Sequence, residues 1–324
     1  MNTTWMIQTH GDPLNAVQKL VQDIWKHANL DEMVVSIDGK GVKGHLLEDP
    51  VQLDKINPFR PLMVVNTAKL VLEIQAAHPQ ERQGVLLRPC ELRALNEMAA
   101  RGAVRTNRLL TICVDCLGTF PEDEFQWRSV RKGSAKGLDK EALQFAPQGG
   151  ISAYRYRAAC QMCTSSGATE ADVNIGVLGL PVRQVMLINV KDGDLDWKTI
   201  TDGLADPALT AKRELMLAKL TERYSRTRER VISGLMQVLP ANVDALLDQF
   251  EACGNCRTCM DSCPICAAEY PRQGQDGRFL REDVINWLVS CAGCGMCEQA
   301  CPRNLPLSII FTHVRQEIDK TLVL

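Results

Sequence analysis

Two stretches between residues 253 and 302 repeat one arrangement of cysteines, C-x2-C-x2-C-x3-C-P. This spacing is typical of ferredoxins with two 4Fe–4S clusters, in which three thiolates hold one cubane and the fourth reaches the other. The ligands expected for one cluster are Cys253, Cys256, Cys259 and Cys301, and those for the other are Cys263, Cys291, Cys294 and Cys297. Zinc also accepts four thiolates, but this repeated order with its trailing prolines favours iron–sulfur clusters.

Six further cysteines fall outside these two sets: Cys90, Cys113, Cys116, Cys160, Cys163 and Cys266. Cys90 follows a predicted strand, and Cys116 lies just beyond another. Because the carboxyl ends of parallel strands share one edge of a sheet, these two cysteines are expected to converge there with the Cys160–Cys163 pair. The third predicted 4Fe–4S cluster therefore has the ligands Cys90, Cys116, Cys160 and Cys163.

The alternative to a third cluster is that these are core cysteines or a redox pair. Cys113 lies inside the apolar strand, where a buried thiol needs no special role. Cys266 fits neither C-terminal quartet and is expected to be a buried thiol.

The elements that must position these residues alternate between helix and strand over residues 1–205. Asp12 and Pro13 predict the start of a helix, as does Asn66 before the apolar pattern of 67–77. The strand "GVLLR" (84–88) is followed at once by the helix "PCELRALNEMAARG" and then by the strand "RLLTICV". This order predicts an α/β domain with a mixed sheet. Residues 121–150 are polar and rich in glycine, and a loop is expected there.

The rest of the chain is expected to be helical. Residues 206–245 carry many charges and predict a helical linker with a solvated face. Residues 246–324 predict a mainly helical, ferredoxin-like domain with two 4Fe–4S clusters. The 27 residues between Cys263 and Cys291, which include the helical pattern "REDVINWLVS", resemble the α-helical ferredoxin modules of heterodisulfide reductase and succinate dehydrogenase iron–sulfur subunits.

Composition limits the remaining possibilities. The chain has 324 residues, 45% of them hydrophobic, with 14 cysteines and a net charge of −2. The small charge gives no reason to expect nucleic acid as a partner. No apolar run approaches the roughly 18 residues of a membrane span, and the start lacks the pattern of a signal peptide, so we expect a cytoplasmic protein. In a reducing compartment, metal ligation is a better use of cysteines than disulfides.

Three segments, "RPCELRAL", "CVDCLGTF" and "CQMC…ADVNIGVLG", resemble in order the beta-subunit family of deazaflavin-reducing hydrogenases and formate dehydrogenases. The resemblance spans about residues 60 to 185, and the C-terminal repeat resembles family members fused to a ferredoxin module. It implies an iron–sulfur flavoprotein with FAD and a cluster on Cys90, Cys116, Cys160 and Cys163. Cys113 departs from the family pattern, which leaves the choice between Cys113 and Cys116 open.

The candidate FAD-binding residues are Asn66, Thr67, Arg88, Gly176 and Gly179. The helix that begins after Asn66 offers N–H groups to a pyrophosphate, and the glycines permit close approach of a flat ring. Arg88 would place a positive charge beside a reduced flavin or cluster. Ordinary capping, bulge glycines and a surface arginine are the alternative interpretations.

Together these features predict an electron-transfer subunit of a soluble redox complex. Its catalytic partner is expected to be of formate dehydrogenase, hydrogenase or heterodisulfide reductase type, and FAD would convert between one-electron clusters and a hydride carrier. One alternative is a flavin-free, ferredoxin-like relay and docking subunit. Another is an interaction protein stabilised by zinc. No acid–base or nucleophile constellation indicates further chemistry, and the electron acceptor stays open.

Overall fold

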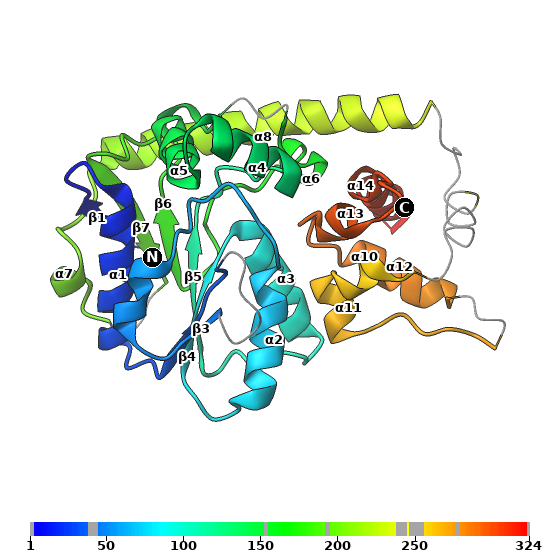
Figure 1. The fold of residues 1–324 in the computed structure, drawn as a ribbon, viewed down its shortest axis with the longest axis horizontal. Helices are drawn as coiled ribbons and strands as arrows, with labels where there is room; N and C mark the ends of the chain where they lie inside the picture. Colours follow the sequence, from blue (N-terminus) through cyan, green and yellow to red (C-terminus); the bar gives the residue numbers. More distant parts are fainter. Residues whose placement is uncertain are drawn as a thin grey trace.

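A computed structural model describes residues 3–37, 45–151, 155–191, 195–237, 245, 256–275 and 279–322, with the side chains of the last helix described to residue 318. A layered α/β part lies beside a smaller group of short helices formed by the C-terminal part of the chain (Figure 1). Cys253 and most of the predicted boundary between linker and ferredoxin-like domain lie outside the described residues.

One sheet of seven strands organises the α/β part, in the order β1-β7-β6-β5-β4-β2-β3. The strands are β1 (Thr3–Gln8), β2 (Glu32–Val34), β3 (Leu46–Leu47), β4 (Gln83–Leu87), β5 (Leu109–Val114), β6 (Val173–Gly176) and β7 (Val185–Val190). Strands β2, β4, β5 and β6 run parallel, whereas β1, β3 and β7 pair antiparallel with their neighbours. The predicted mixed sheet is confirmed.

Local signals set the helices that flank this sheet. Helix α1 (Pro13–His27) begins where Asp12 accepts a hydrogen bond from Asn15 N, and α2 (Thr67–Ala77) begins where Asn66 accepts one from Ala68 N. Helix α3 (Pro89–Ala100) follows β4 directly and ends before Gly102, whose φ of +72° suits a residue without a Cβ. These three helix predictions are confirmed.

Side chains that alternate along the central strands pack into two separate hydrophobic cores, one on each face of the sheet. On β4, Leu86 packs into the core beneath α1, whereas Val85 and Leu87 pack into the core beneath α2 and α3. On β5, Ile112 packs into the core beneath α1, and Cys113 packs into the core beneath α2 and α3. The second core is continuous with buried residues of the C-terminal helices, so the α2–α3 side of the sheet is the side that receives the ferredoxin-like region.

The segment 121–150 is helical, and the expectation of a loop there was wrong. It forms α4 (Glu122–Arg131), α5 (Ala135–Gln144) and the short 3-10 helix η3 (Ala146–Gln148). Three acidic residues occupy the first turn of α4, where the helix dipole favours negative charge, and Ser134 caps α5. Phe125 and Leu138 pack together in a small core of their own.

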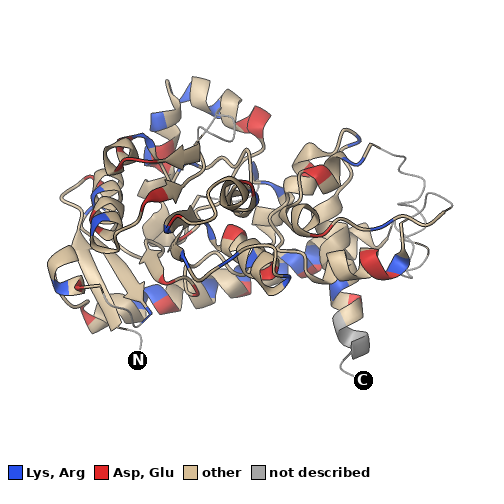
Figure 2. Ribbon diagram, turned by 90° about the horizontal axis from the view of Figure 1, so that it is seen from below, with Lys and Arg blue, Asp and Glu red and all other residues tan. Residues whose placement is uncertain are grey.

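A long helix, α8 (Pro207–Leu235), connects the two parts of the chain and runs along both of them (Figure 1). It follows the short helix α7 (Trp197–Ile200). Most of its charged side chains are exposed, as expected, but Arg213 is buried and pairs with Asp115 at 2.6 Å. Basic and acidic positions are interspersed over the whole ribbon (Figure 2), in keeping with the net charge of −2.

The C-terminal helices dock on the α/β part, and all but the last are short. They are α10 (Thr258–Asp261), α11 (Pro264–Ala268), α12 (Arg281–Val289), α13 (Met296–Ala300) and α14 (Leu307–Leu322). Lys69 of α2 donates to the carbonyl of Asp261, and Arg101 at the end of α3 pairs with Glu269. Within the described part of the chain, no helix has the length and apolar character to cross a membrane.

Candidate iron–sulfur centres

The cysteines of the predicted third cluster come from three places at the carboxyl edge of the sheet. Cys90 lies in the first turn of α3, after β4, and Cys116 follows the end of β5. Cys160 and Cys163 lie on and just after the short helix α6 (Ala158–Gln161).

The structure brings these four thiols into one another's electrostatic range. Burial raises the pKa of the Cys90 thiol, and neighbouring Cys116 raises it further. Burial likewise raises the pKa of Cys116 to about 12, with Cys160 and Cys163 acting in the same direction and Arg88 against it. Such mutual destabilisation of thiolates is relieved when cationic iron binds them.

Cys113 differs from Cys116 in its surroundings. Its side chain is fully buried in the core beneath α2 and α3, as the sequence predicted for a thiol inside a strand. Cys116, beyond the strand end, is only partly buried, and its N–H donates to the carbonyl of Ser166. This placement favours Cys116 as the cluster ligand.

Four cysteines of the ferredoxin-like region form a second group, Cys263, Cys291, Cys294 and Cys297. Burial raises the pKa of Cys291 to about 12, and Cys294 and Cys263 add to the shift. The pKa of Cys297 is raised by burial and then by the other three thiols. The fourth cysteine of the first repeat therefore lies within electrostatic range of three cysteines of the second, and the exchange of ligands between the repeats stays a prediction.

Cys263 is surrounded by hydrogen-bond donors. The Cys266 thiol donates to it and Trp287 Nε1 donates to its sulfur at 3.3 Å, so that its pKa is lowered to about 6 despite burial. Cys266 is itself buried, as predicted, but its role as a donor to Cys263 was not anticipated from sequence. Donors to ligand sulfurs tune the potential of a cluster.

The remaining quartet is described in part. Cys256 is exposed, Cys259 lies on α10, and buried Cys301 ends α13, the helix that contacts α10. Cys253 lies outside the described residues. Over the described ranges, no three His, Cys, Asp or Glu side chains are placed to hold a single metal ion. In a cubane each thiolate binds a different iron atom, so its ligand sulfurs stand further apart than those around one ion.

The third-cluster group and the Cys263 group are neighbours in space. Cys294 packs with Met63, Met296 and Cys90 in one small apolar cluster. Two arginines lie at this junction, Arg157 and Arg93.

Arg157 is a buried cation, with 6% of the residue exposed. Its Nε donates to Thr119 Oγ1 at 2.8 Å, Nη1 donates to Gln299 Oε1 at 3.2 Å, and Nη2 lies 3.9 Å from Cys160 Sγ. No acidic side chain among the described residues pairs with it. Burial lowers its pKa, but Cys160, Cys90 and Cys294 outweigh burial and leave the pKa raised. The groups that raise the pKa of Arg157 are therefore cysteine side chains on both sides of it.

Arg93 of α3 occupies a similar position. Its guanidinium donates to the carbonyls of Ala292 and Ser165, and thereby joins the two parts of the chain. Burial again lowers its pKa, whereas Cys163, Cys90 and Cys294 raise it. Sequence reasoning missed both arginines. The one available signal for Arg157 was its position three residues before Cys160.

The residues expected to bind flavin are engaged within the protein. Asn66 and Thr67 are buried, and Thr67 donates through both N and Oγ1 to Glu91 Oε1, at 3.0 and 2.8 Å. Asn66 accepts from Ala68 N, so the N–H groups of Thr67 and Ala68 at the start of α2 are hydrogen-bonded within the protein. The Asn66 side chain lies near Cys294. It lowers the pKa of the Cys294 thiol, whereas burial raises that pKa.

The two glycines also serve packing. A Cβ on Gly176 would stand 2.2 Å from Arg213 Nε, and one on Gly179, whose φ is +80°, would stand 2.7 Å from Met216 Cβ. Helix α8 approaches both glycines closely. Arg88 donates to the carbonyls of Arg60 and Leu62, and its charge lies near Cys116, which agrees with the cluster interpretation of this residue. A flavin site at these residues stays a prediction.

Comparison with known proteins supports the iron–sulfur assignment. Residues 252–305 match the family described as "4Fe-4S dicluster domain", so the C-terminal region is a 4Fe–4S ferredoxin-like domain. The chain is also similar to the F420-dependent formate dehydrogenase subunit beta of Methanocaldococcus jannaschii, with 21% identity over 305 residues, 79% of this chain and 76% of the relative.

Proposed function

We propose that this chain is an iron–sulfur electron-transfer subunit of a formate dehydrogenase-type redox complex and carries three 4Fe–4S clusters. Two belong to the C-terminal repeat, on the ligand sets given by its spacing. The third is held by Cys90, Cys116, Cys160 and Cys163 at the carboxyl edge of the sheet.

The observation that carries the third cluster is the buried charge of Arg157. A buried, unpaired cation costs several kcal/mol, and proteins retain one only where a counter-charge stands beside it. For Arg157 the neighbouring groups of negative character are the thiols of Cys160, Cys90 and Cys294. Four thiolates around a cubane give the cluster a net negative charge, which would balance the guanidinium.

The arrangement suits single-electron relay. Cys90 and Cys294 share one apolar cluster, so a cluster at the sheet edge would adjoin the one that includes Cys294. With the proposed exchange of ligands between the two repeats, the centre on Cys253, Cys256, Cys259 and Cys301 would come next in line. The protein contributes spacing, burial and hydrogen bonds to sulfur, while the clusters supply the redox chemistry.

This proposal also concerns the electron acceptor and a possible bound flavin. The similar subunit is named F420-dependent, and a flavin would convert single electrons into the hydride that a deazaflavin accepts. A bound FAD at Asn66, Thr67, Gly176 and Gly179 would compete with the contacts that these residues make within the protein. Their engagement within the protein favours the second candidate, a flavin-free relay and docking subunit.

Anaerobic purification of the full chain with metal and flavin analysis tests these statements. Three clusters require about 12 iron atoms and about 12 acid-labile sulfides per chain. A reproducible content near 8 would remove the third cluster and leave the C-terminal pair. FAD released by acid would exclude the flavin-free relay. Co-purification with a formate dehydrogenase-type, hydrogenase-type or heterodisulfide reductase-type catalytic subunit would identify the partner.

A further inference from the structure

Two buried side chains beside the cysteine groups carry hydrogen-bond donors without a partner. Asn66 is 1% exposed and Tyr156 is 3% exposed. Neither Asn66 Nδ2 nor the Tyr156 hydroxyl has a hydrogen-bond partner of ordinary geometry among the described residues. An unsatisfied buried donor costs free energy, and proteins satisfy nearly all such groups. Each of these donors therefore indicates an acceptor other than the protein atoms around it.

The orientation of the Asn66 amide is fixed by helix α2. Its Oδ1 accepts a hydrogen bond from Ala68 N at 3.0 Å, which caps the helix. Exchange of Oδ1 and Nδ2 would break this cap, so the two N–H groups of Nδ2 stay available on the other side of the amide. Burial raises the pKa of the Cys294 thiol, whereas the Asn66 side chain lowers it. Asn66 is thus placed to donate towards the Cys263 group.

The Tyr156 ring is held beside the third-cluster group. It packs on Phe120, with ring centres 4.7 Å apart, and a Cβ on Gly118 would stand 2.3 Å from Tyr156 Cε2. Burial raises the pKa of Tyr156, and the thiols of Cys116 and Cys160 act in the same direction. The hydroxyl therefore keeps its proton and is a donor within range of two of the four thiols proposed to hold the third cluster.

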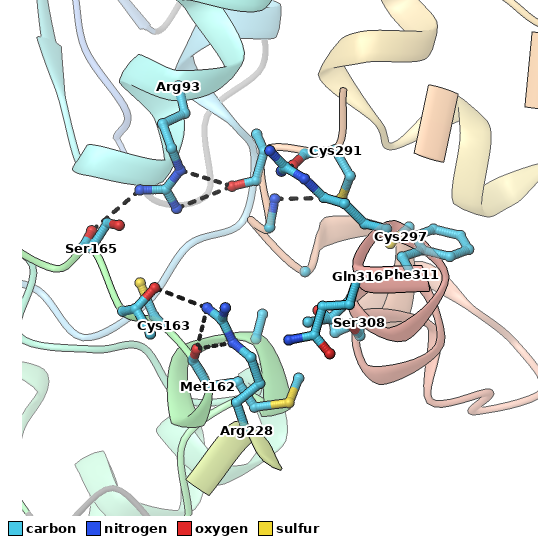
Figure 3. Close-up of a pocket in the computed structure, with 17 residues that line it drawn as sticks. Arg93, Met162, Cys163, Ser165, Arg228, Cys291, Cys297, Ser308, Phe311 and Gln316 are labelled. Atoms are coloured by element: carbon cyan, nitrogen blue, oxygen red, sulfur yellow. Dashed lines mark hydrogen bonds between the residues drawn. The ribbon is translucent and has the colours of Figure 1, made fainter. Parts of the chain in front are cut away.

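Ser308 provides a contrast, because its surroundings offer another acceptor. Its Oγ also lacks a hydrogen-bond partner among the described residues. However, Ser308 lines a cavity of about 350 Å³ between the two parts of the chain, together with Cys163 and Cys297 (Figure 3). A polar cavity of this size is large enough for water to satisfy the hydroxyl. Neither Asn66 nor Tyr156 lines this cavity.

We propose that Asn66 and Tyr156 donate hydrogen bonds to sulfur in two different clusters, Asn66 to the cluster of the Cys263 group and Tyr156 to that of the third-cluster group. The inference rests on the proposed function and deepens it, because it names side chains outside the thiolate ligands that set the potentials of the relay. A donor stabilises negative charge on sulfur and so favours the reduced cluster. Each donor should raise the potential of its own cluster.

Redox titration of the anaerobically purified, cluster-loaded full chain, followed by electron paramagnetic resonance, tests this inference. Y156F keeps the ring and removes the hydroxyl, and N66S keeps an oxygen that caps α2 and removes the amide donor. Each variant should shift its own cluster about fivefold towards the oxidised form and leave the other cluster unchanged. At 59 mV for each tenfold change, this lowers the midpoint potential by about 40 mV.

W5F is the matched control. Trp5 Nε1 is another buried donor without a partner among the described residues, but Trp5 lies on β1, three strands from β5, and packs against the core beneath α1. Its replacement should leave all cluster potentials unchanged. The C116S variant, which should lack the third cluster, identifies the signals that belong to that cluster.

A spectroscopic readout separates hydrogen bonding from packing. Cluster loading in D2O labels the Asn66 amide and the Tyr156 hydroxyl, and electron–nuclear double resonance of the reduced protein detects deuterons beside each cluster. N66S should lose deuteron couplings of the Cys263-group cluster, and Y156F those of the third cluster. If N66S loads less iron than the wild type, N66D replaces it, because it keeps the size of the side chain and the cap. N66D should lower the potential further than N66S.

The outcomes against the inference differ from those against the proposed function. A variant whose own cluster keeps its potential and deuteron couplings, at full iron content, overturns that half of the inference and leaves the relay intact. For Asn66, an unchanged potential in N66D does the same. An iron content near 8 in the wild type would overturn the third cluster and the Tyr156 half with it, while the C-terminal clusters would still decide the Asn66 half.

Discussion

The charge of Arg157 should set the reduction potential of the cluster proposed at the sheet edge. Its Nη2 lies 3.9 Å from Cys160 Sγ, and the side chain is buried. Replacement by glutamine in R157Q removes the positive charge while keeping a hydrogen-bonding side chain of moderate size. Reduction adds an electron to the cluster, and this electron is stabilised less when the cation is absent.

The size of the effect follows from Coulomb's law. Two unit charges about 4 Å apart interact by about 4 kcal/mol at an effective dielectric constant of ~20. The added electron is spread over the whole cubane, whose centre is further from the guanidinium than the ligand sulfur, so we take about half of this value. Roughly 2 kcal/mol corresponds to about 90 mV for a one-electron couple, since a tenfold change in the equilibrium is 59 mV. R157Q should therefore lower the midpoint potential by about 90 mV.

Redox titration of the anaerobically purified chain, followed by electron paramagnetic resonance, measures this shift. R157K, which keeps the charge, should shift the potential less than R157Q. R155Q is the matched control, because Arg155 is exposed two residues earlier and its replacement changes the net charge by the same amount. A difference of less than about 20 mV between R157Q and R155Q, with full iron content in both, would refute the idea that Arg157 balances a cluster.

Stability gives a second readout for the same residue. In the cluster-free chain Arg157 is a buried cation without its counter-charge, so R157Q should cost little free energy of unfolding, or none. In the cluster-loaded chain the same change removes a compensated charge and should cost more. Chemical denaturation of both forms under argon measures the difference, and an equal loss in both forms would mean that Arg157 has only a packing role.

Three other predictions concern ligands, donors and the fold. C116S should lower the iron content from about 12 to about 8 atoms per chain, whereas C113S should leave it unchanged; the reverse pattern would make Cys113 the ligand. W287F removes the indole donor to the Cys263 sulfur and should lower the potential of that cluster by a few tens of millivolts at unchanged iron content, which a redox titration checks. D115A leaves Arg213 buried without its partner and should lower the free energy of unfolding by about 3–5 kcal/mol, and the double variant with R213M should recover part of that loss in urea denaturation.

Local patterns in the sequence predicted a large part of the fold. Helix starts at Pro13, Thr67 and Pro89 depend on a cap or proline within one turn, so the necessary information is local. The segment 121–150 was misjudged because polar composition and glycine outweighed the acidic first turn of α4 and the cap at Ser134. Its helices also depend on the packing of Phe125 against Leu138, which composition does not reveal.

The candidate site likewise has features that follow from local spacing and features that depend on the whole fold. The ligand sets of the C-terminal repeat follow from spacing, because the distance between thiolates along the chain limits which iron atoms they reach. The flavin prediction requires unbonded N–H groups at the start of α2 and open space beside the glycines. Whether such groups and space exist depends on the whole fold. Glu91, 24 residues from Thr67, occupies the donors of α2. Arg213 occupies the space that Gly176 leaves.

The sequence did not predict how buried charges balance one another. This balance explains why residue 157 is an arginine. A guanidinium keeps its proton at every accessible pH, and the thiol groups around Arg157 raise its pKa further in spite of burial. A lysine in the same place would lose its proton more readily on burial, and a histidine would titrate near neutral pH. With arginine the positive charge beside Cys160 is constant, so the contribution of this residue to the potential of the cluster should not vary with pH. The potential difference between wild-type protein and R157Q is accordingly expected to be the same at about pH 6 and pH 8.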